Sequence, residues 1–176
     1  TKQYFLIAIA GTHGKTTTTA MLIDILEEAG KDPTAIVGSL RIKTKSNFRA
    51  GQGKYFIAEA DEYQKHFLNL TPKILAITNI DADHLDYYKN LKDIQNAFSE
   101  LVSKIPESGF LVCNPTDSKI RLVLKSVKCQ IIDYTKIRKK LKLKFPGQHN
   151  IENAKTAFAV AKVLGIPEEK IITALK

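Results

Sequence analysis

A short glycine-containing loop between an apolar strand and a helix constrains this chain more than any other feature. The stretch Tyr4–Ala10 is almost entirely apolar and predicts a buried strand. The next residues, 11–16, are Gly-Thr-His-Gly-Lys-Thr. A helical pattern then covers Lys15–Ala29 and is closed by Gly30. A strand, a glycine loop and a helix in this order are typical of a turn that holds polyphosphate.

The residue types of this loop suit phosphate binding. Gly11 and Gly14 allow tight turns and bring backbone N–H groups close to phosphate oxygens, while Lys15 adds a positive charge and the Thr16 hydroxyl can join a magnesium shell. The other candidate residues of the nucleotide site are Thr12, His13 and Thr17. The strict pattern G-x-x-x-x-G-K-[ST] is not satisfied, because Ile9 occupies the position of its first glycine. An ordinary corner between a strand and a helix therefore stays as the alternative.

The composition predicts one soluble globular domain over residues 1–176. Hydrophobic residues make up 44% of the 176 residues and charged residues 26%, which is enough apolar material for a sizeable core. No apolar run approaches the roughly 18 residues of a membrane span, and no secretory signal is present at the start. We therefore expect a cytoplasmic protein with no membrane partner. Cys113 and Cys129 lack C-x-x-C spacing, so we expect reduced core residues that bind no metal.

The net charge of +9 raises the question of a polyanionic partner, and much of the excess lies in Lys136–Lys144. Within this segment Lys140 and Lys142 alternate with leucines, which predicts an exposed edge strand over Lys140–Phe145. The aromatic residues on which single-stranded nucleic acid stacks are absent here. We therefore favour a solvated edge strand over nucleic-acid binding, with attraction of an anionic nucleotide as a minor benefit.

Apolar runs alternate with helical patterns along the chain. The expected strands are Tyr4–Ala10, Thr34–Val37, Tyr55–Ala58, Ile74–Asn79, Phe110–Cys113, Cys129–Tyr134 and Lys140–Phe145. The expected helices are Lys15–Ala29, Leu91–Ile105, Ser118–Lys125 and His149–Leu164, with a last short helix opened by Pro167. Continuous apolar strands between helices predict an α/β fold with a mostly parallel sheet flanked by helices. Such sheets bind ligands at the carboxyl ends of their strands.

Residues 41–53 interrupt this alternation. They are rich in Lys, Ser, Asn and Gly and contain few apolar residues. This composition predicts a mobile surface loop or a poorly paired hairpin. A lid that contacts substrate is the functional alternative.

Three carboxylates follow the third expected strand in the run Glu59-Ala-Asp-Glu62. Hard divalent cations prefer such oxygen ligands. Acidic residues at a helix N-terminus would account for Asp61 and Glu62, but less well for Glu59, which directly follows the strand. We therefore predict metal binding for Glu59.

A second acidic run follows the fourth expected strand, over residues 78–87. It contains His84 between Asp83 and Asp86. A histidine among carboxylates is suited to a second metal ion or to proton transfer, whereas a lone histidine in a loop is usually surface decoration. The nearby phosphate loop and acidic run favour the functional interpretation.

A turn at residues 145–148 precedes the last long helix, whose first residues include His149, Asn150 and Asn153. Asn150 could simply cap the helix. Asn150 and Asn153 are three residues apart and share one helical face, where their amides suit the edge of a purine.

These motifs, in this order, resemble the central ATP-binding domain of the Mur ligases, which has a P-loop NTPase-like fold. The histidine inside the phosphate loop and the E-A-D-E run are most similar to the branch that joins L-alanine to UDP-N-acetylmuramate. The resemblance covers essentially the whole chain. Full members also carry an N-terminal domain for the UDP-sugar and a C-terminal domain that closes over ATP. The resemblance therefore implies a fragment that is inactive as a ligase by itself.

The resemblance also implies roles for the candidate residues. Lys15 would contact the β- and γ-phosphates of ATP, Thr16 and Glu59 would hold one Mg2+ ion, and His84 would hold a second. The residues that would line the nucleotide site are His149, Asn150 and Asn153. Lys15, Glu59 and His84 are therefore the expected catalytic residues, and ATP and Mg2+ the expected cofactors.

The implied activity is ATP-dependent amide formation in peptidoglycan precursor synthesis. A carboxylate attacks the γ-phosphorus, an acyl phosphate forms, and an amine displaces phosphate. The full-length enzyme would act on UDP-N-acetylmuramate and an amino acid, expected to be L-alanine. The alternatives are a related ligase of the pseudomurein or folyl-polyglutamate type, a non-catalytic nucleotide-binding module, and a nucleic-acid-binding protein.

Overall fold

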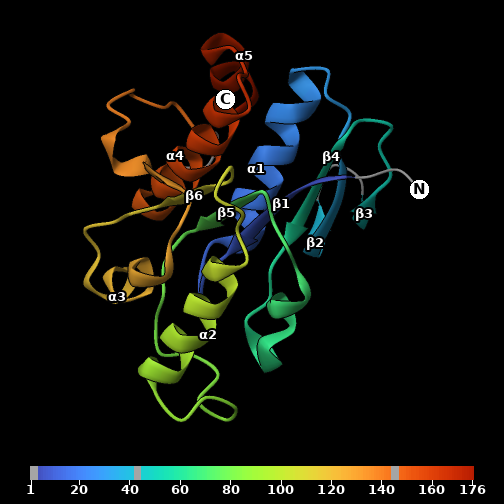
Figure 1. Cartoon of the computed structure of the whole chain (residues 1–176). Helices are drawn as coiled ribbons and strands as arrows, with labels where there is room; N and C mark the ends of the chain where they lie inside the picture. Colours follow the sequence, from blue (N-terminus) through green and yellow to red (C-terminus); the bar gives the residue numbers. More distant parts are fainter. Residues whose placement is uncertain (1–3, 42–44, 144–146) are drawn as a thin grey trace.

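A seven-stranded sheet forms the centre of the computed structural model, which describes residues 4–41, 45–143 and 147–176. The strands are β1 (Phe5–Ala10), β2 (Thr34–Arg41), β3 (Ser46–Arg49), β4 (Tyr55–Glu59), β5 (Ile74–Ile77), β6 (Phe110–Cys113) and β7 (Gln130–Asp133). Their order across the sheet is β3-β2-β4-β1-β5-β6-β7 (Figure 1). Every neighbouring pair is parallel except β2 and β3. The predicted mostly parallel sheet is confirmed.

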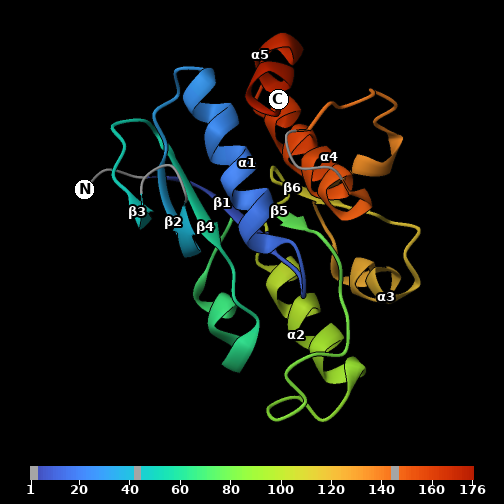
Figure 2. The ribbon, with the colours of Figure 1, turned by 180° about the vertical axis from the view of Figure 1, so that it is seen from behind.

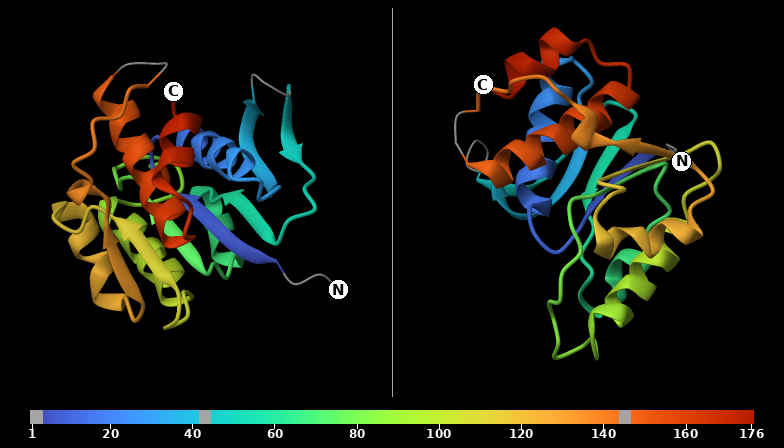
Figure 3. Two further views of the ribbon diagram at one scale, coloured as in Figure 1. Left: turned by 90° about the horizontal axis from the view of Figure 1, so that it is seen from above. Right: turned by 90° about the vertical axis from the view of Figure 1, so that its left-hand side faces the viewer.

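Helices cover both faces of this sheet. They are α1 (Lys15–Glu28), α2 (Leu91–Ser103), α3 (Ser118–Arg121), α4 (Gln148–Val163) and α5 (Glu168–Ala174), with 3-10 turns η1 (Tyr63–Asn69), η2 (Val123–Ser126) and η3 (Tyr134–Lys136). On one face α1 lies beside α4 and α5 (Figure 2), and α2 lies on the other with η1 and η2. Figure 3 shows the sheet between these two layers. None of the helices in the described ranges is long and apolar enough to cross a membrane.

The central strand β1 separates two hydrophobic cores. Ile7 and Ile9 face the core beneath α1 and α4, whereas Ala8 and Ala10 face the core beneath α2, and all four side chains are fully buried. A strand buried on both faces needs apolar residues at every position, because its side chains alternate between the faces. This requirement explains the continuous apolar run and places the loop after β1 in the middle of the sheet edge.

The irregular segment 41–53 contains a hairpin. Strand β2 continues to Arg41, and β3 pairs with it antiparallel through Ile36 and Phe48. The pairing shifts register between Ile36 and Arg41, so the hairpin is irregular, as one of the two structural interpretations predicted. Residues 42–44 lie outside the described residues.

The predicted strand Lys140–Phe145 is wrong for the part that the structure describes. Residues 140–143 have no strand structure, and 144–145 lie outside the described residues. The alternation itself is real, since Leu141 and Leu143 pack against the α1 and α4 core while Lys140 and Lys142 are exposed. The segment buries one side on the core without pairing to a neighbouring strand, and a period of two cannot distinguish these arrangements.

The expected helix Ser118–Lys125 and the two cysteines also differ in detail from expectation. The helix is divided into α3 and the 3-10 turn η2, so it is not continuous.

Both cysteines are free, and Cys113 is buried while Cys129 is partly exposed. Burial raises the pKa of the Cys113 thiol to about 12, so it stays protonated and unreactive at neutral pH.

Candidate functional site

The loop after β1 turns in a way that only glycine permits without strain. Gly11 and Gly14 have φ angles of 132° and 83°, in the range that side chains disfavour. A Cβ on Gly11 would stand 2.1 Å from the Thr78 hydroxyl, and one on Gly14 would stand 2.3 Å from Oδ1 of Asn153. The loop is therefore pressed between the end of β5 and helix α4, and both glycines are needed for this close fit.

The amide groups that open α1 are available to an anion. Gly14 is the N-cap, and no side chain among the described residues caps this helix end. The first-turn N–H groups, at residues 15–17, have no acceptor within the helix, and the helix dipole adds partial positive charge. Thr17 belongs to this turn. The start of α1 thus has the chemistry of an anion site.

Residues after β5 hold the preceding part of the loop. The Asn79 side chain accepts from the His13 N–H at 2.9 Å and donates to the His13 carbonyl oxygen at 2.9 Å. The Asn79 carbonyl oxygen accepts from the Thr12 N–H at 3.2 Å, and Thr78 Oγ1 donates to the His13 carbonyl oxygen at 2.6 Å. Sequence reasoning missed Thr78 and Asn79 as loop supports. These bonds occupy the backbone N–H groups of Thr12 and His13, two candidate residues of the nucleotide site.

Lys15 reaches back over its own loop. Its Nζ donates to the Gly11 carbonyl oxygen at 2.7 Å and contacts the Thr12 carbonyl oxygen at 3.3 Å. It also lies 2.8 Å and 3.1 Å from the two carboxylate oxygens of Glu62. Glu62 is only 2% exposed. Sequence reasoning assigned Glu62 no role beyond a helix N-terminus, yet it is the acidic partner of the loop lysine.

His84 lies on the other side of this carboxylate. Its Nε2 is 3.8 Å from Oε1 of Glu62, and its ring packs 5.0 Å from the Tyr63 ring between centroids. The His84 backbone has a φ of 52°, a left-handed conformation that is uncommon outside glycine. Glu62 therefore lies between the loop lysine and the histidine that the sequence singled out.

Glu59, at the end of β4, contacts a different part of the loop. Its Oε1 accepts from the Thr16 hydroxyl at 2.9 Å, and its Oε2 accepts from the Gly38 N–H at 2.7 Å. A Cβ on Gly38 would stand 2.8 Å from Oε1 of Glu59. The predicted pair of Thr16 and Glu59 is brought together, with Gly38 as a support that the sequence did not indicate.

The oxygen donors at this end of the sheet fit a magnesium ion that phosphate also ligates. Magnesium usually takes one or two protein oxygens and completes its shell with phosphate and water. Thr16 and Glu59 offer such oxygens side by side. No three His, Cys, Asp or Glu side chains within the described ranges are placed to hold a metal ion by themselves. The described residues therefore offer oxygens for part of a metal shell and no complete cage.

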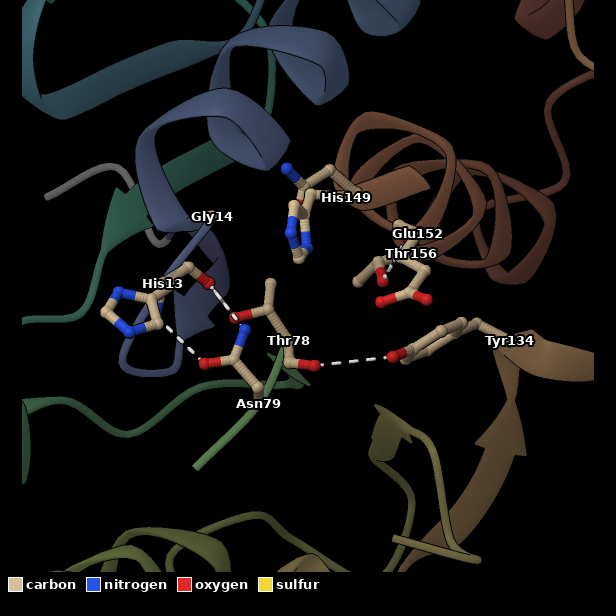
Figure 4. A pocket seen from close by; sticks show the side chains of 9 residues that line it. His13, Gly14, Thr78, Asn79, Tyr134, His149, Glu152 and Thr156 are labelled. Carbon is tan, nitrogen blue, oxygen red and sulfur yellow. Dashed lines mark hydrogen bonds between the residues drawn. The ribbon is translucent and has the colours of Figure 1, made fainter. Parts of the chain in front are cut away.

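A pocket opens between the loop and α4 (Figure 4). Its lining residues are His13, Gly14, Thr78, Asn79, Tyr134, His149, Glu152, Asn153 and Thr156. The Tyr134 hydroxyl donates to the Thr78 carbonyl oxygen at 3.3 Å. Burial raises the pKa of Tyr134 to about 12, so this donor stays protonated at neutral pH. The pocket lies where the start of α1 meets polar groups of α4.

The predicted residues of α4 take different positions. His149 and Asn153 line the pocket. Asn153 is 8% exposed, and its side chain lies close to Gly14. Asn150 lies near Gly147 at the start of the helix and does not belong to this lining. Figure 4 shows the His13 ring turned away from Tyr134. Glu152, Thr156 and Tyr134 are pocket residues for which the sequence offered no separate signal.

Comparison with known proteins points to one family. The family described as the Mur ligase middle domain matches residues 9–140. A UDP-N-acetylmuramate--L-alanine ligase from Clostridium kluyveri is 41% identical over an alignment that covers 97% of this chain and 43% of that protein. A ligase of the same name from Syntrophotalea carbinolica is 39% identical and also covers 43%. The chain thus spans less than half the length of the curated relatives it matches.

Solved structures agree with this result. A UDP-N-acetylmuramate:L-alanyl-gamma-D-glutamyl-meso-diaminopimelate ligase from Neisseria superposes with a TM-score of 0.90 at 25% identity, over 98% of this chain and 65% of that chain. A UDP-N-acetylmuramate-alanine ligase from Thermotoga maritima gives a TM-score of 0.81 at 28% identity, over 99% of this chain and 45% of that chain. The architecture described above is therefore shared with these ligases.

Proposed function

The chain belongs to the Mur ligase family, and we propose that it is the ATP-binding domain of a ligase that joins L-alanine to UDP-N-acetylmuramate. The relatives that carry this activity in their names are about twice as long as the chain, so the activity is proposed for a full-length enzyme. Such an enzyme would work in the cytoplasm, where ATP and nucleotide sugars are found. The isolated domain would bind ATP and Mg2+ without forming the amide.

One observation carries the proposal: the loop between β1 and α1 is joined by contacts to both acidic runs. Thr16 contacts Glu59, and Lys15 contacts Glu62, which approaches His84. A triphosphate with its counter-ions needs cationic, amide and carboxylate groups at one place. An ordinary corner between a strand and a helix has no need of this combination.

The residues suit transfer of a phosphoryl group to a carboxylate. This chemistry depends on positioning and on neutralisation of charge, and it needs no serine or cysteine nucleophile. The amides at the start of α1 would hold phosphate oxygens, and Lys15 would neutralise the transferred group. We propose no general base among the described residues.

Magnesium would add Lewis-acid polarisation of the phosphoryl oxygens. Thr16 and Glu59 are the proposed residues for one ion, and His84 for a second. His149 and Asn153 would contact the nucleoside from α4, and Asn150 would contribute from the start of the same helix. The amine of the amino acid would then attack the acyl carbon and displace phosphate, a step that lies outside the chemistry of this domain.

Two measurements test the proposal at separate levels. Isothermal titration of this chain with ATP and Mg2+ should give saturable binding, and a chain that binds neither ATP nor ADP would contradict the nucleotide site. The full-length enzyme should release phosphate from ATP when given UDP-N-acetylmuramate and L-alanine. Glycine, L-serine and glutamate in place of L-alanine test the related ligases, and preferred turnover with glutamate would contradict the proposed substrate.

A further inference from the structure

Glu62 is the most deeply buried acidic side chain at the site, and the proposed reaction leaves it without a role. Its side chain is 2% exposed, whereas the Lys15 side chain beside it is 14% exposed. A carboxylate at this depth is costly unless it is ionically paired and hydrogen-bonded. The pairing with Lys15 is therefore the main compensation for burying this charge.

The position of Glu62 is fixed by its backbone. Its carbonyl oxygen accepts from the Tyr88 hydroxyl at 2.5 Å and from the Lys65 N–H at 3.0 Å. Tyr88 is itself 2% exposed in the core beneath α2. Burial raises the pKa of the Tyr88 hydroxyl to about 12, so it remains a donor. The carboxylate is thus presented to the loop from a rigid base.

The Lys15 ammonium has no proton to spare in this arrangement. An ammonium group donates three hydrogen bonds. The acceptors around Nζ are already the carbonyl oxygens of Gly11 and Thr12 and the carboxylate of Glu62. A phosphate that contacts Lys15 must therefore displace at least one of them, and it brings its own negative charge toward Glu62.

We propose that Glu62 is a positioning residue that acts through Lys15: it holds the ammonium over the loop and competes with phosphate for it. The inference rests on the proposed nucleotide site. The ion pair with Glu62 keeps Lys15 ordered. The competition between Glu62 and phosphate lowers the affinity for polyphosphate. Nucleotide binding then exchanges one anionic partner of Lys15 for another, so the charge of Glu62 sets how tightly the phosphates are held.

The test compares Glu62→Gln with the wild-type chain. Glutamine keeps the shape and one acceptor oxygen but removes the charge that competes with phosphate. We expect ATP without metal to bind about tenfold more tightly to the variant, because like-charge repulsion and the ion pair are both removed. Inorganic tripolyphosphate should tighten by a similar factor, and adenosine should not change. The measurement is isothermal titration in EDTA, repeated with Mg2+.

A metal-binding or purely structural role for Glu62 predicts a different pattern of affinities. Weaker binding of ATP with Mg2+, and no change without metal, would make Glu62 a metal ligand and would overturn the inference. Equal loss of affinity for ATP and adenosine would make its role merely structural and would also overturn it. Glu107→Gln is the matched control, since Glu107 is exposed before β6 at the opposite edge of the sheet. It should leave every affinity unchanged.

A second variant keeps the inference testable if Glu62→Gln does not fold. Glu62→Asp keeps the charge but shortens the side chain by one methylene, which loosens its hold on Lys15. ATP should then bind about twofold to threefold more tightly, because the nearby charge remains but the direct contact is lost. Unchanged or weaker ATP binding there would overturn the inference. A wild-type chain that binds no ATP would overturn the proposed function as well, whereas ATP binding without tightening overturns the inference alone.

Discussion

The two glutamates of the E-A-D-E run differ more than their spacing suggests. Glu59 is partly exposed at the end of β4, where the Thr16 hydroxyl and the Gly38 N–H donate to it. Glu62 is almost fully buried before η1, where the Lys15 ammonium is its partner. Neutral donors leave the charge of Glu59 free to attract a cation, whereas Lys15 neutralises that of Glu62. We therefore propose different roles for the same residue type, a metal ligand at Glu59 and a counter-ion of Lys15 at Glu62.

Among the variants that test this difference between the two glutamates, Lys15→Ala should have the largest effect. Losing a hydrogen bond between charged groups costs about 1.5–3 kcal/mol, so ATP should bind to the variant roughly ten to a hundred times more weakly while adenosine binding persists. The variant also leaves Glu62 buried without its partner, which should lower the free energy of unfolding by about 3–5 kcal/mol. Titration calorimetry and urea unfolding measure the two effects.

The double variant Lys15→Ala/Glu62→Gln separates these effects. It should regain much of the stability, because no uncompensated charge stays buried, but it should not regain ATP affinity. Retention of near-normal ATP binding in Lys15→Ala would count heavily against the phosphate loop.

Glu59→Gln should produce the opposite metal dependence from Glu62→Gln. The amide keeps an acceptor for Thr16 and Gly38 but is a poor magnesium ligand. We expect the Mg2+ concentration for half-maximal stimulation of ATP binding to rise about tenfold, without weaker binding in EDTA. An unchanged magnesium titration would remove Glu59 from the metal shell.

His84→Asn should have a smaller effect on the same titration. Asparagine tolerates the positive φ of residue 84, so the variant removes the imidazole without straining the backbone. The half-saturating Mg2+ concentration should rise roughly threefold to fivefold, because the first ion site is intact. If magnesium and ATP titrations both match those of the wild-type chain, His84 is not a metal ligand, and its contacts with Tyr63 and Glu62 are structural.

Gly38→Ala should give the smallest change in half-saturating Mg2+, and it tests the role proposed for Glu59. The new methyl group would press on Oε1 of Glu59, so the carboxylate has to shift. Half-saturating Mg2+ should rise about twofold, with ATP binding in EDTA preserved. Ser39→Ala, the next residue of β2, is the control and should change neither value. If Gly38→Ala and Ser39→Ala have the same half-saturating Mg2+, displacement of the Glu59 carboxylate does not affect magnesium binding.

Much of the fold followed from periodicity. The apolar run of β1, the helical pattern of α1 and the alternation of later strands with helices predicted the parallel sheet that the structure contains. Because parallel strands end at one edge, the same pattern predicted that the acidic runs would approach the loop. The failure at Lys140–Phe145 shows the limit, since alternation of Leu141 and Leu143 reports burial on one side and says nothing about strand pairing.

The site was predictable as a set of residue types but not as a set of contacts. Glycine, lysine and threonine after a buried strand identify a phosphate loop by their chemistry. The engagement of two loop amides by Asn79, and the position of Asn150 outside the pocket lining, depend on how β5 and α4 approach the loop. Such approaches join residues more than sixty positions apart, and no local pattern specifies them.

The amino-acid sequence by itself determined the α/β fold, the strand edge that carries the polar groups and the loop at its centre, because these follow from periodicity and from glycine's freedom at positive φ. Only the tertiary structure decided which glutamate meets Lys15 and which meets Thr16. Burial and distance determine these two pairings, and both depend on how strands and helices from distant parts of the chain pack together.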